Sequence, residues 1–107
     1  MKKQNKMLIC LDESELKGSN IVAYFGAKWM PSNKKILRNF DILSKKYNNI
    51  KFIYVDTDNF KDYCKRNAIE CIPYYLLINP SKNIIEGING MVLSAALKSK
   101  ISEIFKE

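Results

Sequence analysis

Apolar runs of five to seven residues alternate with amphipathic stretches along most of the chain. The apolar runs predict strands at residues 6–11, 21–25, 50–56, 74–79 and 84–88. The runs at 21–25 and 50–56 are almost wholly apolar, which is typical of central parallel strands that are buried on both faces. The run at 84–88 follows that at 74–79 after the turn sequence Pro-Ser-Lys-Asn, so these two are expected to form a hairpin.

Helical periodicity occupies the stretches between these runs. It predicts a helical turn at 12–20, a long helix at 32–49, a short helix at 58–66 and a last amphipathic helix at 91–106. Ser32 is expected to cap the long helix, Asn48 and Asn49 to end it, and Asp58 to begin the short one. The inner face of the long helix is expected to comprise Ile36, Phe40, Leu43 and Tyr47.

The order of these elements is β-α-β-α-β-α-β-β-α, which predicts the α/β class. Parallel strands joined by crossover helices, with one terminal hairpin, give a mixed central β-sheet flanked by helices. A chain of 107 residues is long enough for one core that buries roughly two-thirds of the surface of the unfolded chain. A single domain over residues 1–107 is therefore expected.

Composition and charge narrow the classes of partner. The chain carries 18 basic and 11 acidic side chains, a net charge of +7, but Arg38 and Arg66 are its only arginines. Proteins that read nucleic acid favour arginine for its bidentate geometry, whereas a joint excess of Lys, Asn and Ile is typical of an AT-rich coding sequence. The predominance of lysine over arginine therefore argues against nucleic-acid binding. The apolar run at 7–11 is too short for a membrane span or a signal peptide, so a cytoplasmic protein without a membrane partner is expected.

Three cysteines and no histidine restrict the site chemistry further. An odd number of cysteines without paired spacing does not predict a disulfide framework, and without histidine a zinc site is not expected. Neither a metal nor a cofactor is expected. The cysteine content fits a reducing compartment.

Several short motifs occur in an order that resembles the thioredoxin family over about residues 6–106. They are Ala-Lys-Trp at 27–29, Lys34 five residues after Trp29, Val-Asp-Thr-Asp at 55–58, Ile-Pro at 72–73, and Gly90 before the last helix. The resemblance implies the thioredoxin fold. It also implies a cis peptide bond between Ile72 and Pro73.

The chain departs from the family where the redox chemistry takes place. Thioredoxins have Trp-Cys-Gly-Pro-Cys-Lys at the start of the second helix, and this chain has Trp29, Met30, Pro31, Ser32, Asn33 and Lys34. Met30 stands at the position of the attacking cysteine and Asn33 at that of the resolving cysteine. Thiol–disulfide exchange requires a thiolate as nucleophile. The sequence therefore predicts no dithiol oxidoreductase activity and no catalytic residue, which argues against an enzyme.

Three further positions differ from the family near this motif. Tyr24 stands where the family has a buried Asp, and Tyr54 where it has the Lys partner of that Asp. Gly26 replaces a second Trp. In the family, the buried Asp is thought to transfer protons for the redox cysteines. Without those cysteines a buried acid only costs desolvation energy, so its replacement fits a site without redox activity.

The groove that thioredoxins use to hold a partner is expected to persist. In the family, the backbone of the residue before the cis-proline pairs with an extended segment of the partner protein, and such pairing needs no cysteine. The expected partner is a protein or extended peptide, and the expected state is a monomer or weak dimer. The predicted groove residues are Trp29, Met30, Pro31, Ile72, Pro73 and Gly90.

Alternatives to a non-covalent binding module remain open. Met30 is interpreted as an apolar contact, with a soft-metal ligand or an oxidation sensor as alternatives. Cys71 is interpreted as a partly buried, unreactive side chain, or as a single thiol that is glutathionylated or links two chains. Cys10 and Cys64 are expected in the core. The basic side chains along 34–46 and the missing redox cysteines also fit an assembly role in a ribonucleoprotein complex.

Overall fold

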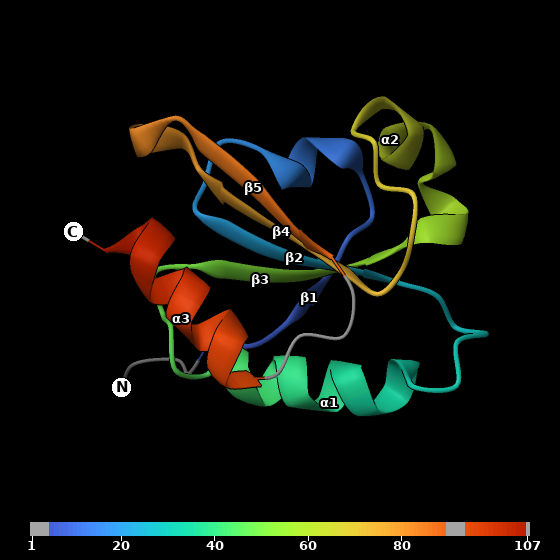
Figure 1. Cartoon of the computed structure of the whole chain (residues 1–107), viewed down its shortest axis with the longest axis horizontal. Coiled ribbons are helices and arrows are strands. Elements are labelled where there is room, and N and C mark those ends of the chain that lie inside the picture. Colours follow the sequence, from blue (N-terminus) through green and yellow to red (C-terminus); the bar gives the residue numbers. More distant parts are fainter. Residues whose placement is uncertain (1–4, 90–93, 107) are drawn as a thin grey trace.

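The computed structural model describes residues 5–89 and 94–106, which form a central sheet with helices on both faces (Figure 1). The strand order is β1-β3-β2-β4-β5. β3 lies parallel to β1 and β2, whereas β4 is antiparallel to both β2 and β5. The strands are β1 (Leu8–Ile9), β2 (Ile21–Gly26), β3 (Lys51–Asp56), β4 (Tyr74–Asn79) and β5 (Ile84–Asn89). The predicted mixed sheet and its hairpin are confirmed.

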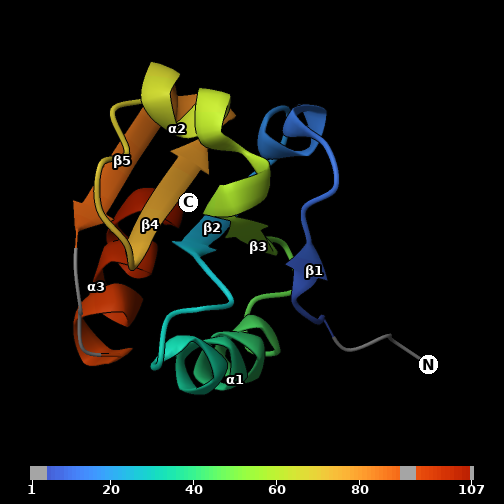
Figure 2. The same cartoon turned by 90° about the vertical axis from the view of Figure 1, so that its right-hand side faces the viewer.

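Two long helices cover one face of the sheet and shorter elements cover the other (Figures 1 and 2). The long helices are α1 (Asn33–Ser44) and α3 (Ser94–Phe105), and the core beneath them includes Phe40, Leu97 and Ile101. The other face carries the 3₁₀ turn η1 (Glu13–Leu16) and the helix α2 (Lys61–Arg66), preceded by the 3₁₀ turn η2 (Thr57–Asn59). A third turn, η3 (Pro80–Lys82), joins β4 to β5.

The first strand is shorter than the predicted 6–11 because side chains take its backbone hydrogen bonds at both ends. The Met7 N–H donates to Asp41 Oδ1 at 3.1 Å, and the Leu11 N–H donates to Glu15 Oε2 at 2.7 Å. Only Leu8 and Ile9 pair in register with β3, and the Cys10 N–H adds one more bond to Tyr54.

The long helix ends at Ser44, before the predicted Asn48 and Asn49. The side-chain amide of Asn5 donates to the carbonyl oxygens of Ser44, Tyr47 and Ile50 at 2.8–3.0 Å. A helix that continued would use the first of these carbonyls for its own i+4 bond, so Asn5 acts as a C-terminal cap from a distant segment.

Two predicted helix starts are also corrected. Ser32 precedes α1, but its side chain makes no capping hydrogen bond. The predicted helix at 58–66 divides into η2 and α2, because Asp56 caps η2 by accepting from the Asp58 N–H at 3.0 Å and Phe60 departs from helical geometry. In the described ranges, 5–89 and 94–106, no helix has the length and apolar character to cross a bilayer.

Candidate functional site

The residues of the altered motif lie at one end of the sheet, where β2 and β3 end and β4 begins. Phe25 pairs with Tyr74 across β2 and β4, and Gly26 pairs with Asp56 across β2 and β3. The loops that continue from these pairs are therefore neighbours. They gather at the right-hand end of the molecule in Figure 1 and face the viewer in Figure 2.

Trp29 is exposed but held in one orientation. Its side chain is 67% exposed, and its Nε1–H donates to Asp58 Oδ2 at 3.1 Å. Asp58 belongs to η2 and is itself exposed. The indole therefore presents an apolar ring to solvent without the rotational freedom of an unanchored side chain.

Four more predicted groove residues occupy the same end of the sheet. Met30 is half-buried and packs against the core beneath α1, and Pro31 is exposed. Ile72 and Pro73 are half-buried, and the peptide bond between them is cis. We refer to these four residues together with Trp29 as the Trp29 surface. Gly90, the sixth predicted groove residue, lies outside the described residues.

Asn33, the first residue of α1, is buried in a hydrogen-bonded chain with two tyrosines. Its Oδ1 accepts from the Tyr24 hydroxyl at 2.8 Å, and its Nδ2 donates to the Tyr54 hydroxyl at 3.3 Å. The two rings stack with centroids 5.7 Å apart. Tyr24, Asn33 and Tyr54, three of the positions at which the sequence predicted a departure from thioredoxins, are thus one connected unit.

Gly26 leaves the space that this unit needs. A Cβ at position 26 would lie 2.5 Å from both the Tyr24 hydroxyl oxygen and Asn33 Oδ1, which is closer than real Cβ atoms approach. The glycine at the place of the family's second tryptophan is therefore required by the tyrosine and the asparagine beside it.

The unit does not ionise near neutral pH. Burial raises the pKa of the Tyr24 hydroxyl, with smaller contributions from Tyr75 and Tyr54. Burial also raises the pKa of Tyr54, against the opposing effect of its hydrogen bond from Asn33. Both phenols stay protonated and the amide has no titratable proton, so these groups neither donate nor take up a proton at neutral pH.

The cysteines differ in exposure. Cys10 and Cys64 are buried, and burial raises the pKa of both thiols. Cys71 is exposed, and its Sγ–H donates to Asn89 Oδ1 at 3.2 Å. It directly precedes Ile72 and therefore borders the Trp29 surface. Within the part of the chain that the structure describes, no cluster of His, Cys, Asp or Glu could hold a metal ion.

A family model described as Thioredoxin matches residues 12–103. The chain belongs to the thioredoxin family. Rabbit thioredoxin is 33% identical over 79 residues, which are 72% of this chain and 75% of the rabbit protein. A rice protein named thioredoxin-like protein CXXS1 is 24% identical over 90 residues, 84% of this chain and 67% of the rice protein.

Solved thioredoxin structures share the fold. A point mutant of thioredoxin from Halobacterium salinarum superposes with a TM-score of 0.84 at 16% identity, covering 100% of this chain and 97% of that one. Thioredoxin from Nicotiana alata gives a TM-score of 0.79 at 19% identity, covering 97% and 96%. The thioredoxin fold predicted from the order of motifs is confirmed.

The predicted groove residues in the described ranges lie at one end of the sheet, but the contacts behind them were not predicted. The hydrogen bonds between Asn33 and the two tyrosines were not predicted. A signal was present: Tyr24 and Tyr54 lie in the two predicted central parallel strands, and they pair directly in register. The bond from Trp29 to Asp58 had no comparable signal, because it depends on where η2 begins.

The basic side chains of residues 34–46 are all exposed. Lys34, Lys35 and Arg38 lie on α1, and Lys45 and Lys46 follow its end at Ser44.

Proposed function

We propose that this thioredoxin-like protein binds an extended segment of another protein non-covalently at the Trp29 surface and does not carry out dithiol–disulfide exchange. The observation that carries the proposal is the Tyr24–Asn33–Tyr54 unit. It fills the position of the resolving cysteine with a hydrogen-bonded amide and removes the buried acid, so restoring redox chemistry would require several coupled changes.

The Trp29 surface has the features of a small recognition site. An exposed, oriented tryptophan is the side chain that most often dominates binding energy at protein interfaces. The Ile72–Pro73 loop runs beside it and offers backbone groups for pairing with an extended segment. A surface of this size buries less than about 1,200 Å², so a transient complex of a monomer is expected. Three unbridged thiols in the chain fit a reducing compartment such as the cytoplasm.

Affinity capture with alkylated protein tests the proposal. The exposed Cys71 is blocked with iodoacetamide, and partners are captured from reduced native lysate by the wild type, Trp29→Ala and Ile72→Asp. The matched controls are Leu11→Ala and Ile42→Asp, since Leu11 and Ile42 are exposed apolar residues elsewhere on the surface. The same partners should be lost in both site variants and kept by both controls. Partners captured only before alkylation, or equally by all variants, contradict the proposal.

A second candidate function is single-thiol chemistry at Cys71, which its exposure favours over the two buried cysteines. The Cys71 thiolate would attack glutathione disulfide, forming a mixed disulfide and releasing one glutathione thiolate. Mass spectrometry after mild treatment with glutathione disulfide tests this function. Modification at Cys71 ahead of Cys10 and Cys64 supports it, and equal or absent modification of the three removes it.

A further inference from the structure

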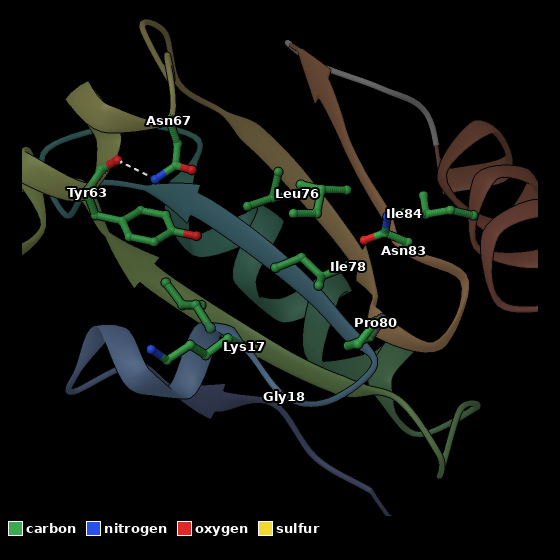
Figure 3. Close-up of a pocket in the computed structure, with 11 residues that line it drawn as sticks. Lys17, Gly18, Tyr63, Asn67, Leu76, Ile78, Pro80, Asn83 and Ile84 are labelled. Carbon is green, nitrogen blue, oxygen red and sulfur yellow. Dashed lines mark hydrogen bonds between the residues drawn. The ribbon is translucent and has the colours of Figure 1, made fainter.

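A cavity of about 290 Å³ opens on the face of the sheet that carries η1 and α2, away from the Trp29 surface (Figure 3). Ile78, on its floor, pairs with Ile21 at the start of β2, whereas the Trp29 surface follows the end of β2. The cavity is bounded by Leu16 and Lys17 of the η1 region, Tyr63 and Asn67 at α2, and β5 with Ile85. It is therefore independent of the altered redox motif.

The cavity exists because the elements on this face are short. η1 has 4 residues and α2 has 6, compared with 12 in each helix on the opposite face. At this end of the sheet, the β4 side chains Leu76 and Ile78 are buried, whereas Ile85 of β5 is exposed. Ile85 is 72% exposed, so a large aliphatic side chain of the cavity lining is accessible to a ligand.

Tyr63 gives the cavity a fixed polar group. Its ring stacks on Phe25 with centroids 5.9 Å apart, and the guanidinium carbon of Arg66 lies 5.9 Å from the ring centroid. Arg66 is held in turn by an ion pair with Glu13 at 2.6 Å. Figure 3 shows the hydroxyl pointing into the cavity. Burial raises the pKa of this hydroxyl, so it remains a hydrogen-bond donor at neutral pH.

The charge at the cavity is positive. Among the described residues that line it, Lys17 is the one with a formal charge. In Figure 3, Lys17 lies on the same side as Tyr63, and Pro80 lies on the opposite side. Ile85, which pairs with Ile78 across β4 and β5, adds an apolar side chain to the lining. A ligand that complements this arrangement has an apolar body and one anionic group.

We propose that the cavity binds a small amphiphilic monocarboxylate, with its chain against Ile78 and Ile85 and its carboxylate at the Lys17 ammonium and the Tyr63 hydroxyl. A volume of about 290 Å³ is at the lower end for ligand sites. Octanoate, a saturated monocarboxylate, serves as the probe of this ligand class.

A nuclear magnetic resonance titration with octanoate on the full chain tests the proposal. Saturable shifts are expected at the amides of Gly18, Asn67 and Asn83, which line the cavity. Each CH₂ added between hexanoate and octanoate should lower the dissociation constant about fourfold, because it buries more apolar surface in the cavity. Shifts that do not saturate, or that map to the Trp29 surface, overturn the proposal.

Matched variants distinguish the contribution of the carboxylate group to octanoate binding from that of the aliphatic tail. Lys17→Gln should weaken octanoate about tenfold, as expected for loss of a charge-assisted hydrogen bond, while Lys65→Gln, an exposed lysine outside the cavity, should not. Ile85→Asp should abolish binding and Ile9→Asp, also on an exposed strand position, should leave it unchanged. Equal binding of 1-octanol and octanoate, or equal effects of a variant and its control, contradicts the site.

Discussion

At the residue scale, a few substitutions near the start of α1 are explained by one another. Asn33 needs the Tyr24 hydroxyl as a donor, and both need a glycine at position 26. Every buried side-chain nitrogen or oxygen in the described residues has a hydrogen-bond partner, so the altered site is fully satisfied internally. A site left over from a lost activity, without new constraints, would be expected to contain orphaned polar groups.

Replacing the asparagine should therefore cost stability. Asn33→Leu leaves the buried Tyr24 hydroxyl without an acceptor and should lower the free energy of unfolding by about 1–3 kcal/mol. The double variant Tyr24→Phe with Asn33→Leu removes donor and acceptor together and should recover most of that loss. Urea denaturation of the wild type and the variants measures both effects. Additive losses in the double variant would show that the two side chains are not coupled.

A methyl group at position 26 should also destabilise the fold. Gly26→Ala places a Cβ against the Tyr24 ring and the Asn33 amide, which are both enclosed by the core, and overpacking of this kind costs about 1–3 kcal/mol. Thermal unfolding of Gly26→Ala is compared with Ala27→Gly, which removes a methyl group at the neighbouring buried position. A Gly26→Ala protein as stable as the wild type would mean that the close approach is relieved at no cost.

At the element scale, the pattern of apolar residues was enough to predict the order of strands and helices but not their ends. β2, β4 and β5 follow the pattern closely. β2 and β4 are buried along almost their whole length, and β5 alternates between half-buried and exposed residues. β1 and α1 are shorter than the pattern indicates. Glu15 accepts from the Leu11 N–H four residues away, whereas Asp41 and Asn5 bind backbone groups of distant segments. Such contacts between distant segments have no local signature.

The same reasoning applies to the site. The motif residues and their loop were predictable because they follow a strand that the pattern identifies. The Tyr24–Asn33–Tyr54 unit requires the parallel pairing of β2 and β3 in register, which is a tertiary feature. The cavity beneath α2 could not be predicted, because it depends on how little of the sheet the short elements cover.

The Asn5 contact makes a prediction for α1. Asn5→Ala removes one amide that binds three carbonyl oxygens and should lower the free energy of unfolding by about 1–3 kcal/mol. Hydrogen exchange should become faster at the amides of residues 44–50. Asn67→Ala is a matched control, because its amide donates to one carbonyl within the same exposed turn. An effect no larger than the control's would contradict the capping role.

At the scale of the whole molecule, the protein is a thioredoxin fold with two separate candidate binding regions at opposite ends of β4. The end next to Pro73 carries the Trp29 surface, and the end next to Pro80 carries the cavity. Residues 12–103 match the family model, so both regions lie on the shared scaffold.

The buried phenols and thiols should make the free energy of unfolding fall at alkaline pH. Burial raises the pKa of Tyr24, Tyr75, Cys10 and Cys64 above ordinary values of 10.0 for Tyr and 9.0 for Cys. The folded state then keeps protons that the unfolded state has lost, so stability present below pH 9 should fall as the pH rises above it. The slope approaches about 1.4 kcal/mol per pH unit for each such group. Urea midpoints at pH 7, 9 and 10.5 measure the fall, and a constant midpoint would contradict the burial of these groups.

The central claim is that the protein has lost dithiol exchange, and insulin reduction coupled to NADPH and thioredoxin reductase tests it most directly. A redox-active thioredoxin serves as the positive control under the same conditions. We expect insulin to precipitate at the uncatalysed rate at every concentration of this protein, because Met30 and Asn33 offer no thiolate and no resolving thiol. Turnover that rises with protein concentration and consumes NADPH would contradict the account.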